Sequence, residues 1–126
     1  MIIVATLVVS LAAALHVGIF IMESIAWTRP AIWKRFGLAS QADAEITKPL
    51  AYNQGFYNLF LAIGALVGVV FFAVGWEAAG LALVVFTMAS MVAAAMVLVS
   101  TGRRFVGAAF IQGTLPLIGL VLILLA

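Results

Sequence analysis

The chain has 126 residues, of which 67% are hydrophobic and only 8% are charged, and it contains no cysteine. A soluble domain could not cover its surface with so few polar residues, and the lack of cysteine excludes disulfides, thiolate catalysis and cysteine metal sites. The net charge of +2 is explained by membrane topology and contact with anionic lipid, and it does not indicate nucleic acid binding.

Four apolar runs reach the length of about 20 residues that a transmembrane helix needs. They cover approximately residues 2–26, 51–74, 78–99 and 105–125. Because they take up nearly the whole chain, we predict one transmembrane domain, residues 1–126, of the all-α class. Its expected architecture is an integral membrane four-helix bundle with a short amphipathic helix at the membrane interface between the first two spans.

The basic residues predict the orientation. All of them lie in the first and third connections between spans: Arg29, Lys34, Arg35 and Lys48 in the first, Arg103 and Arg104 in the third. The positive-inside rule places both connections in the cytoplasm and both termini outside. This one-sided distribution argues against insertion in two opposite orientations. We expect a bacterial cytoplasmic (inner) membrane.

The first connection is too long for a plain turn. Thr28 is a candidate N-cap, Pro30 suits a first helical turn, and Gly37 can end the helix. Such a helix would be amphipathic and lie at the headgroups; a partner-docking site is the alternative. Its apolar side chains are Ile32, Trp33 and Phe36, alternating with Lys34 and Arg35.

A second short helix is expected after Ser40, which forms a capping-box pattern with Asp43. We predict that this helix runs toward Lys48. Pro49 then either kinks it or starts the second membrane helix.

The second span begins with four hydrogen-bonding side chains, Asn53, Gln54, Tyr57 and Asn58. On a helix they fall within an arc of about 140°, at about 100° per residue. Unsatisfied amides cost several kcal/mol in lipid, so we expect these groups to point into the bundle. The opposite face, which includes Phe56, is expected to meet lipid. Further along the same span, Gly64 and Gly68 form a GxxxG pair expected to pack inside the bundle.

The first span supplies candidate partners for this polar face. His16, Glu23 and Trp27 are seven and four residues apart and would share one face of a regular helix. Glu23 is the only acidic residue in a predicted span, and an ionisable group in such a position is a functional-site candidate by default. His16, the only histidine, would lie about 10 Å deeper. Gln112 adds a polar group on the fourth span.

These side chains predict a polar intramembrane cavity open to the cytoplasmic side. The alternative is an interhelical hydrogen-bond network that only holds the helices together. No metal site is predicted, because His16 and Glu23 are too far apart to share an ion and no second histidine exists. The cofactor stays unknown. The candidate ligand-binding residues are His16, Glu23, Trp27, Asn53, Gln54, Tyr57, Asn58 and Gln112.

The same residues carry a family resemblance over essentially the whole chain. The series His16, Glu23 and Trp27, then "NQGFYN" at 53–58 and Gln112-Gly113, resembles a bacterial and fungal family of small membrane proteins that is catalogued as a numbered domain of unknown function. The resemblance implies a four-helix integral membrane protein whose signature residues are these polar ones. It implies no reaction.

Three readings of the function stay open. The first is binding or transport of a small amphipathic molecule or lipid, with Glu23 as a proton- or cation-responsive anchor. The second is a membrane-embedded enzyme acting on a lipid or quinone-like substrate, with Glu23 and His16 as the candidate catalytic acid and base. The third is a non-catalytic assembly factor. The lipid bilayer is the expected environment, and the sequence allows a homo-oligomer.

Overall fold

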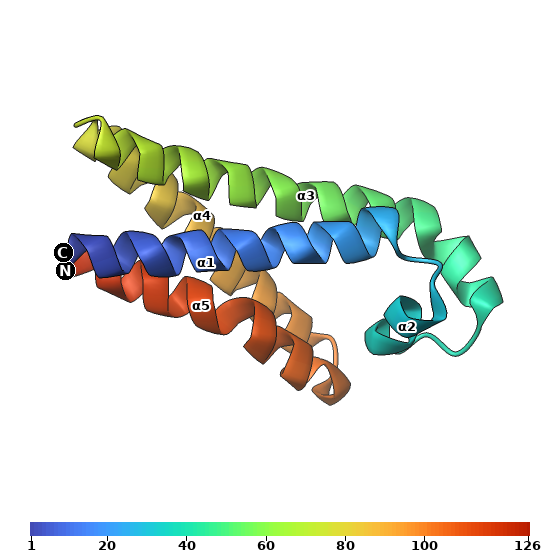
Figure 1. The fold of residues 1–126 in the computed structure, drawn as a ribbon. Coiled ribbons are helices and arrows are strands. Elements are labelled where there is room, and N and C mark those ends of the chain that lie inside the picture. Colours follow the sequence, from blue (N-terminus) through green and yellow to red (C-terminus); the bar gives the residue numbers. More distant parts are fainter. The chain divides into compact units, whose positions relative to one another are not determined.

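The chain folds entirely into helices and connections, without strands, in a computed structural model that describes residues 1–126. The expected all-α class is confirmed. The long helices are α1 (Ile2–Phe20), α3 (Gln41–Ala73), α4 (Glu77–Ser100) and α5 (Val106–Leu124), and a short α2 (Pro30–Trp33) precedes α3 (Figure 1). Single helical turns complete the fold: the π-helical η1 (Ile21–Ile25) and the 3₁₀ turns η2 (Lys34–Phe36) and η3 (Arg103–Phe105).

Four helical stretches are long and apolar enough to cross a membrane. They are Ile2–Ile25, Gln41–Ala73, Glu77–Ser100 and Arg103–Leu124. Each exceeds the length of about 20 residues that spans a hydrocarbon core. The chain is an integral membrane protein, and its long helices are built for a lipid environment.

The contacts divide the chain into two compact units. The four-helix unit comprises Met1–Leu15 and Leu61–Ala126, and the connection unit comprises His16–Phe60. The four-helix unit holds the start of α1, the end of α3, and all of α4 and α5, with both chain termini at one end (Figure 1). The connection unit holds the end of α1, the short turns and the start of α3.

Small residues bring the helices of the four-helix unit close together. A Cβ atom added to Gly80 on α4 would lie 2.8 Å from the Gly68 carbonyl oxygen on α3, and one added to Gly68 would lie 2.8 Å from Val84 Cγ2. One added to Gly64 would lie 2.8 Å from Thr87 Cγ2. The expected role of the Gly64–Gly68 pair in packing within the bundle is therefore confirmed.

The short turns of the connection unit differ from the expected surface helix. The N-cap of α2 is Arg29, not Thr28, since Pro30 forces the preceding residue into an extended conformation. Gly37 ends the segment in the left-handed conformation, as predicted. The short helix expected between the first two spans is present as α2 and η2, but its Trp33 packs against the chain. Only 7% of Trp33 is exposed, and its ring belongs to a buried cluster whose other members are Trp27, Ala44 and Ala51.

The helix expected after Ser40 continues into the second span as one α3 of 33 residues, so Pro49 does not start the second membrane helix. The Ser40 hydroxyl oxygen accepts a hydrogen bond from the Asp43 N–H (3.1 Å) and donates one to the Asp43 carboxylate (2.8 Å), so the predicted cap is present. Pro49 lies inside α3. Its missing N–H frees the carbonyl of Glu45, and because both residues are exposed, water can satisfy that carbonyl.

Candidate functional site

Glu23 lies in the π-helical turn that ends the first long helix. The Ala26 N–H donates to the Ile21 carbonyl oxygen, 2.9 Å away, so the bond spans five residues instead of four. A π-helical turn widens the helix locally, and such turns occur frequently at functional sites. The Glu23 side chain is half-buried there. The turn sets the direction in which this carboxyl group leaves the backbone.

Asn58 on α3 reaches this carboxyl group. Its amide nitrogen donates to Glu23 Oε2 at 2.9 Å and to the Gln54 carbonyl oxygen at 3.2 Å. Within the connection unit, Glu23 Oε1 accepts no hydrogen bond and no cationic side chain pairs with the carboxyl group. The site thus brings two predicted residues together and leaves one carboxyl oxygen available.

Gly55 and Ser24 make the contact between η1 and α3. Gly55 belongs to the "NQGFYN" motif, whereas Ser24 was not among the predicted residues. The Ser24 hydroxyl donates to the Tyr52 carbonyl oxygen at 2.8 Å. A Cβ atom on Gly55 would overlap Ser24 Oγ and would lie 3.1 Å from Glu23 Cβ. Gly55 is therefore the point of closest approach. In the sequence, this close approach could have been inferred from the position of Gly55 in the middle of a polar helical segment.

This contact decides which face of α3 meets the first helix. Phe56 is half-buried and faces Phe20, with ring centroids 5.1 Å apart in an edge-to-face arrangement, so this side of α3 also packs on the first helix. The side chains of Asn53, Gln54 and Tyr57 are exposed, and none of them forms a hydrogen bond within the chain. They lie within five residues of Asn58 along α3.

Trp27 is buried, and its polar group is used within the connection unit. Its Nε1–H donates to the Ala44 carbonyl oxygen at 3.1 Å and to Thr47 Oγ1 at 3.2 Å. Its ring packs on Phe36, with centroids 4.8 Å apart. The regular helix ends at Phe20, so the expectation that Trp27 shares one helical face with Glu23 is wrong.

The two remaining candidates are buried to different degrees. His16 is 1% exposed and belongs to the connection unit. It precedes Glu23 by seven residues, about 10 Å along the helix axis. Gln112 is half-buried on α5 in the four-helix unit. That both residues line a cavity with Glu23 stays a prediction.

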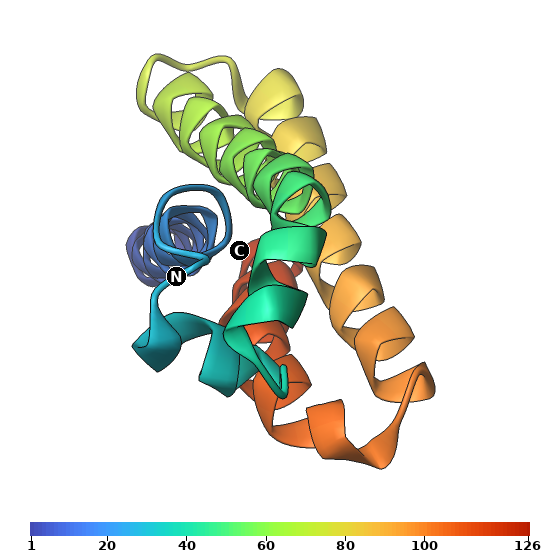
Figure 2. The same ribbon diagram turned by 90° about the vertical axis from the view of Figure 1, so that its right-hand side faces the viewer.

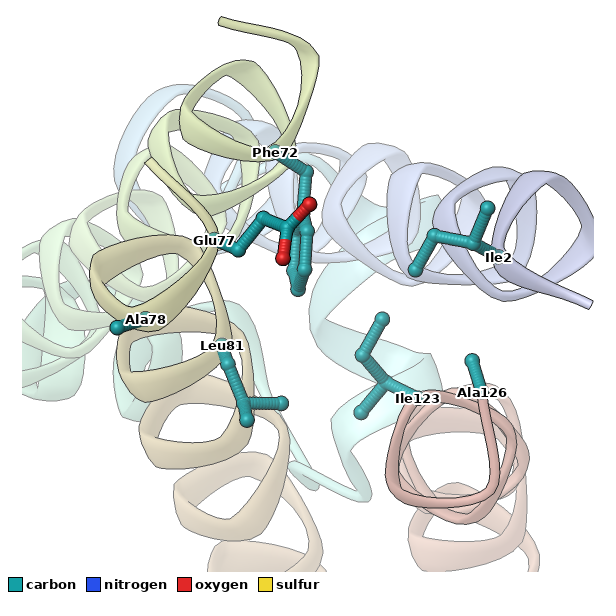
Figure 3. Close-up of a pocket in the computed structure, with 7 residues that line it drawn as sticks. All are labelled: Ile2, Phe72, Glu77, Ala78, Leu81, Ile123 and Ala126. Carbon is teal, nitrogen blue, oxygen red and sulfur yellow. The ribbon is translucent and has the colours of Figure 1, made fainter. Parts of the chain in front are cut away.

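A cavity of about 510 Å³ lies in the four-helix unit, and none of the predicted site residues lines it. Figure 3 shows the Glu77 carboxylate directed into the same space as the side chains of Phe72, Leu81 and Ile123. The sequence analysis did not select Glu77, although it is the only charged residue between Lys48 and Arg103. A single charged residue in so long an apolar stretch could have indicated Glu77 as a candidate site residue.

Comparisons with known proteins give a family but no function. No curated protein and no solved structure matches the chain. A family model matches residues 10–124, which include all the candidate site residues. The family expected from the resemblance is thereby confirmed, and the chain belongs to the family described as "Protein of unknown function (DUF1304)".

Proposed function

We propose that the protein binds a small amphipathic molecule or lipid through Glu23, as a binding protein or transporter of the membrane. The cluster of basic residues in the first and third connections supports a site that opens toward the cytoplasm, with both termini outside. The observation that carries the proposal is the carboxyl group of Glu23, held in a π-helical turn of a membrane span with a single amide donor.

The ligand we propose carries a cationic or hydrogen-bond-donating head and an apolar tail. Asn58 occupies Glu23 Oε2 and leaves Oε1 without a partner in the connection unit. A buried or half-buried carboxyl oxygen gains most from a donor that carries positive charge. The exposed amides and hydroxyl of Asn53, Gln54 and Tyr57 are candidates for orienting polar groups of the same ligand. The tail would lie against the apolar side chains of the spans.

Binding is favoured over acid–base catalysis by the partner of Glu23. An amide cannot relay a proton, and Asn58 is the side chain that contacts the carboxyl group. A side chain that activates another catalytic group directly lies within about 3 Å of it, or reaches it through one water. His16 lies about 10 Å away along the helix axis. A carboxylate steadied by an amide suits recognition of a ligand head.

Native mass spectrometry of the purified protein, titrated with dodecylamine, tests the proposal. Dodecanoic acid has the same tail length and the opposite head charge, so it serves as the ligand control. We expect dodecylamine to bind the wild-type protein and dodecanoic acid to bind at least tenfold more weakly. Glu23→Gln should weaken dodecylamine binding about 10- to 100-fold, since it removes a charge-assisted hydrogen bond of about 1.5–3 kcal/mol.

Two control variants make the same chemical change elsewhere. Glu45→Gln alters an exposed glutamate on α3 and should leave binding unchanged. Glu77→Gln alters the carboxylate at the 510 Å³ cavity and should also leave it unchanged. If Glu77→Gln abolishes dodecylamine binding while Glu23→Gln does not, the proposed site is wrong and the ligand belongs to the other cavity.

A further inference from the structure

An apolar groove runs between α4 and α5 in the four-helix unit. Its volume is about 250 Å³. Ala95 and Ala109 are buried and form its floor, while Met96 and Phe110 are 66% and 71% exposed and form its sides. The remaining lining residues are Val92, Val99, Gly113, Thr114 and Leu117.

The floor of the groove is a close contact between the two helices. A Cβ atom on Gly113 would lie 2.8 Å from Ala95 Cβ, so only a glycine lets α5 approach α4 there. Along α4 the groove extends from Val92 to Val99, about 10 Å at 1.5 Å per residue. That length is most of the hydrocarbon depth of one leaflet, which is about 15 Å.

The groove offers an apolar surface to its occupant. Thr114 is its only side chain with a hydroxyl, and that hydroxyl donates to the Phe110 carbonyl oxygen at 2.6 Å. The hydroxyl is thus engaged with its own helix and offers no unpaired donor to the groove. An alkyl chain matches such a lining, because it needs no hydrogen-bond partner.

Positive charge lies at the end of the groove where α4 and α5 are connected. Arg103 and Arg104 form this connection with Phe105, one turn beyond Val99, and both residues are exposed. Figure 2 shows the connection as the orange turn at the bottom of the view. Arg104 lies over the Phe105 ring, 4.6 Å from its centroid. The sequence has no acidic residue after Glu77, so α5 and its connection to α4 supply no counter-charge.

We propose that this groove binds an acyl chain of an anionic phospholipid, with the lipid phosphate at Arg103 and Arg104. The apolar lining suits an acyl chain, and the length of the groove matches most of the depth of one leaflet. The two arginines suit a negatively charged lipid head. Guanidinium groups bind phosphate oxygens through paired hydrogen bonds. This site is separate from Glu23 and does not depend on the function proposed for that residue.

Native mass spectrometry with dioleoyl phosphatidylglycerol tests the head of the lipid. Arg103→Gln with Arg104→Gln should weaken its binding about 30-fold, because each arginine near an anionic lipid surface contributes about five- to sixfold. The matched control, Lys34→Gln with Arg35→Gln, removes the same charge from two exposed residues of the other basic connection and should leave binding unchanged. Dioleoyl phosphatidylcholine should bind the wild-type protein as weakly as phosphatidylglycerol binds the Arg103/Arg104 variant.

A second pair of variants tests the acyl chain. Leu117→Trp fills the groove and should reduce phosphatidylglycerol binding at least tenfold, whereas Ile118→Trp changes a similarly exposed neighbour outside the groove and should not. Glycerol 3-phosphate, which carries the phosphate without the chain, should not bind. The proposal is overturned if the Arg103/Arg104 and Lys34/Arg35 variants lose the same amount of phosphatidylglycerol binding. It is also overturned if Leu117→Trp and Ile118→Trp bind phosphatidylglycerol equally, or if phosphatidylcholine binds the wild-type protein as well as phosphatidylglycerol does.

Discussion

Gly55→Ala tests the contact on which the candidate site depends. The new Cβ atom would overlap Ser24 Oγ and would lie 3.1 Å from both Glu23 Cβ and the Ser24 nitrogen. Ordinary contacts between carbon atoms are about 3.5–4.0 Å. The hydroxyl could rotate away, but the backbone nitrogen and the Glu23 Cβ atom could not. We therefore expect η1 and α3 to separate.

The magnitude follows from three contributions. Overpacking costs about 1–3 kcal/mol, and loss of the hydrogen bond from Ser24 to the Tyr52 carbonyl costs about 1 kcal/mol. Alanine gains up to about 1 kcal/mol over glycine in a helix interior. The net expectation for Gly55→Ala is a loss of about 1–3 kcal/mol in the free energy of unfolding.

Reversible unfolding in mixed micelles of sodium dodecyl sulfate and dodecyl maltoside, followed by tryptophan fluorescence, measures this loss. Two of the three tryptophans, Trp27 and Trp33, lie in the connection unit, so the signal reports on it. Gly18→Ala is the matched control. A Cβ atom there would meet nothing within 4 Å, so this variant should be as stable as the wild type or more stable. If Gly55→Ala is as stable as Gly18→Ala, η1 and α3 do not approach each other as described.

Three further predictions concern topology and packing. The chain has no cysteine, so single cysteines at Ala39 and Trp76, both exposed, can be labelled with a membrane-impermeant maleimide; position 76 should react from outside the cell and position 39 only after lysis. Ser40→Ala removes the acceptor for the first-turn N–H of α3 and should lower the free energy of unfolding by about 1 kcal/mol in the same assay. An unchanged free energy would show that the cap does not stabilise α3. Gly68→Ala places a methyl group 2.8 Å from Val84 Cγ2 and should destabilise the protein by about 1–3 kcal/mol; wild-type stability would contradict the close packing of α3 on α4.

The apolar spans could be predicted from the sequence because length and composition alone decide whether a helix can cross a bilayer. Local stop and cap signals were equally readable. Gly37 ends its turn in the left-handed conformation and Ser40 caps α3, since both effects involve only neighbouring residues. Thr28 failed as a cap because the conformational demand of Pro30 on Arg29 outweighed it.

The geometry of the site was harder to predict because it depends on contacts between helices. A constant helical period placed Glu23 and Trp27 on one face, but the regular helix stops at Phe20 and the next turn bonds over five residues. Polarity suggested that Asn53, Gln54 and Tyr57 face inward. In the connection unit, α3 meets η1 at the side-chain-free surface of Gly55, and these three side chains are exposed. The close approach at a glycine therefore helps to decide which side of a helix contacts its neighbour.

The continuous α3 has a geometric consequence. Its 33 residues extend about 50 Å, whereas a hydrocarbon core is about 30 Å thick. Nearly four turns therefore extend beyond a core of this thickness, and the end that carries Asp43, Glu45 and Lys48 is suited to lie there. Near this end of α3, the Ala44 carbonyl oxygen accepts a hydrogen bond from Trp27. Further along the same helix, Asn58 donates a hydrogen bond to Glu23. Both contacts are made by this one helix, and Pro49 lies between them at a turn that lacks one backbone hydrogen bond.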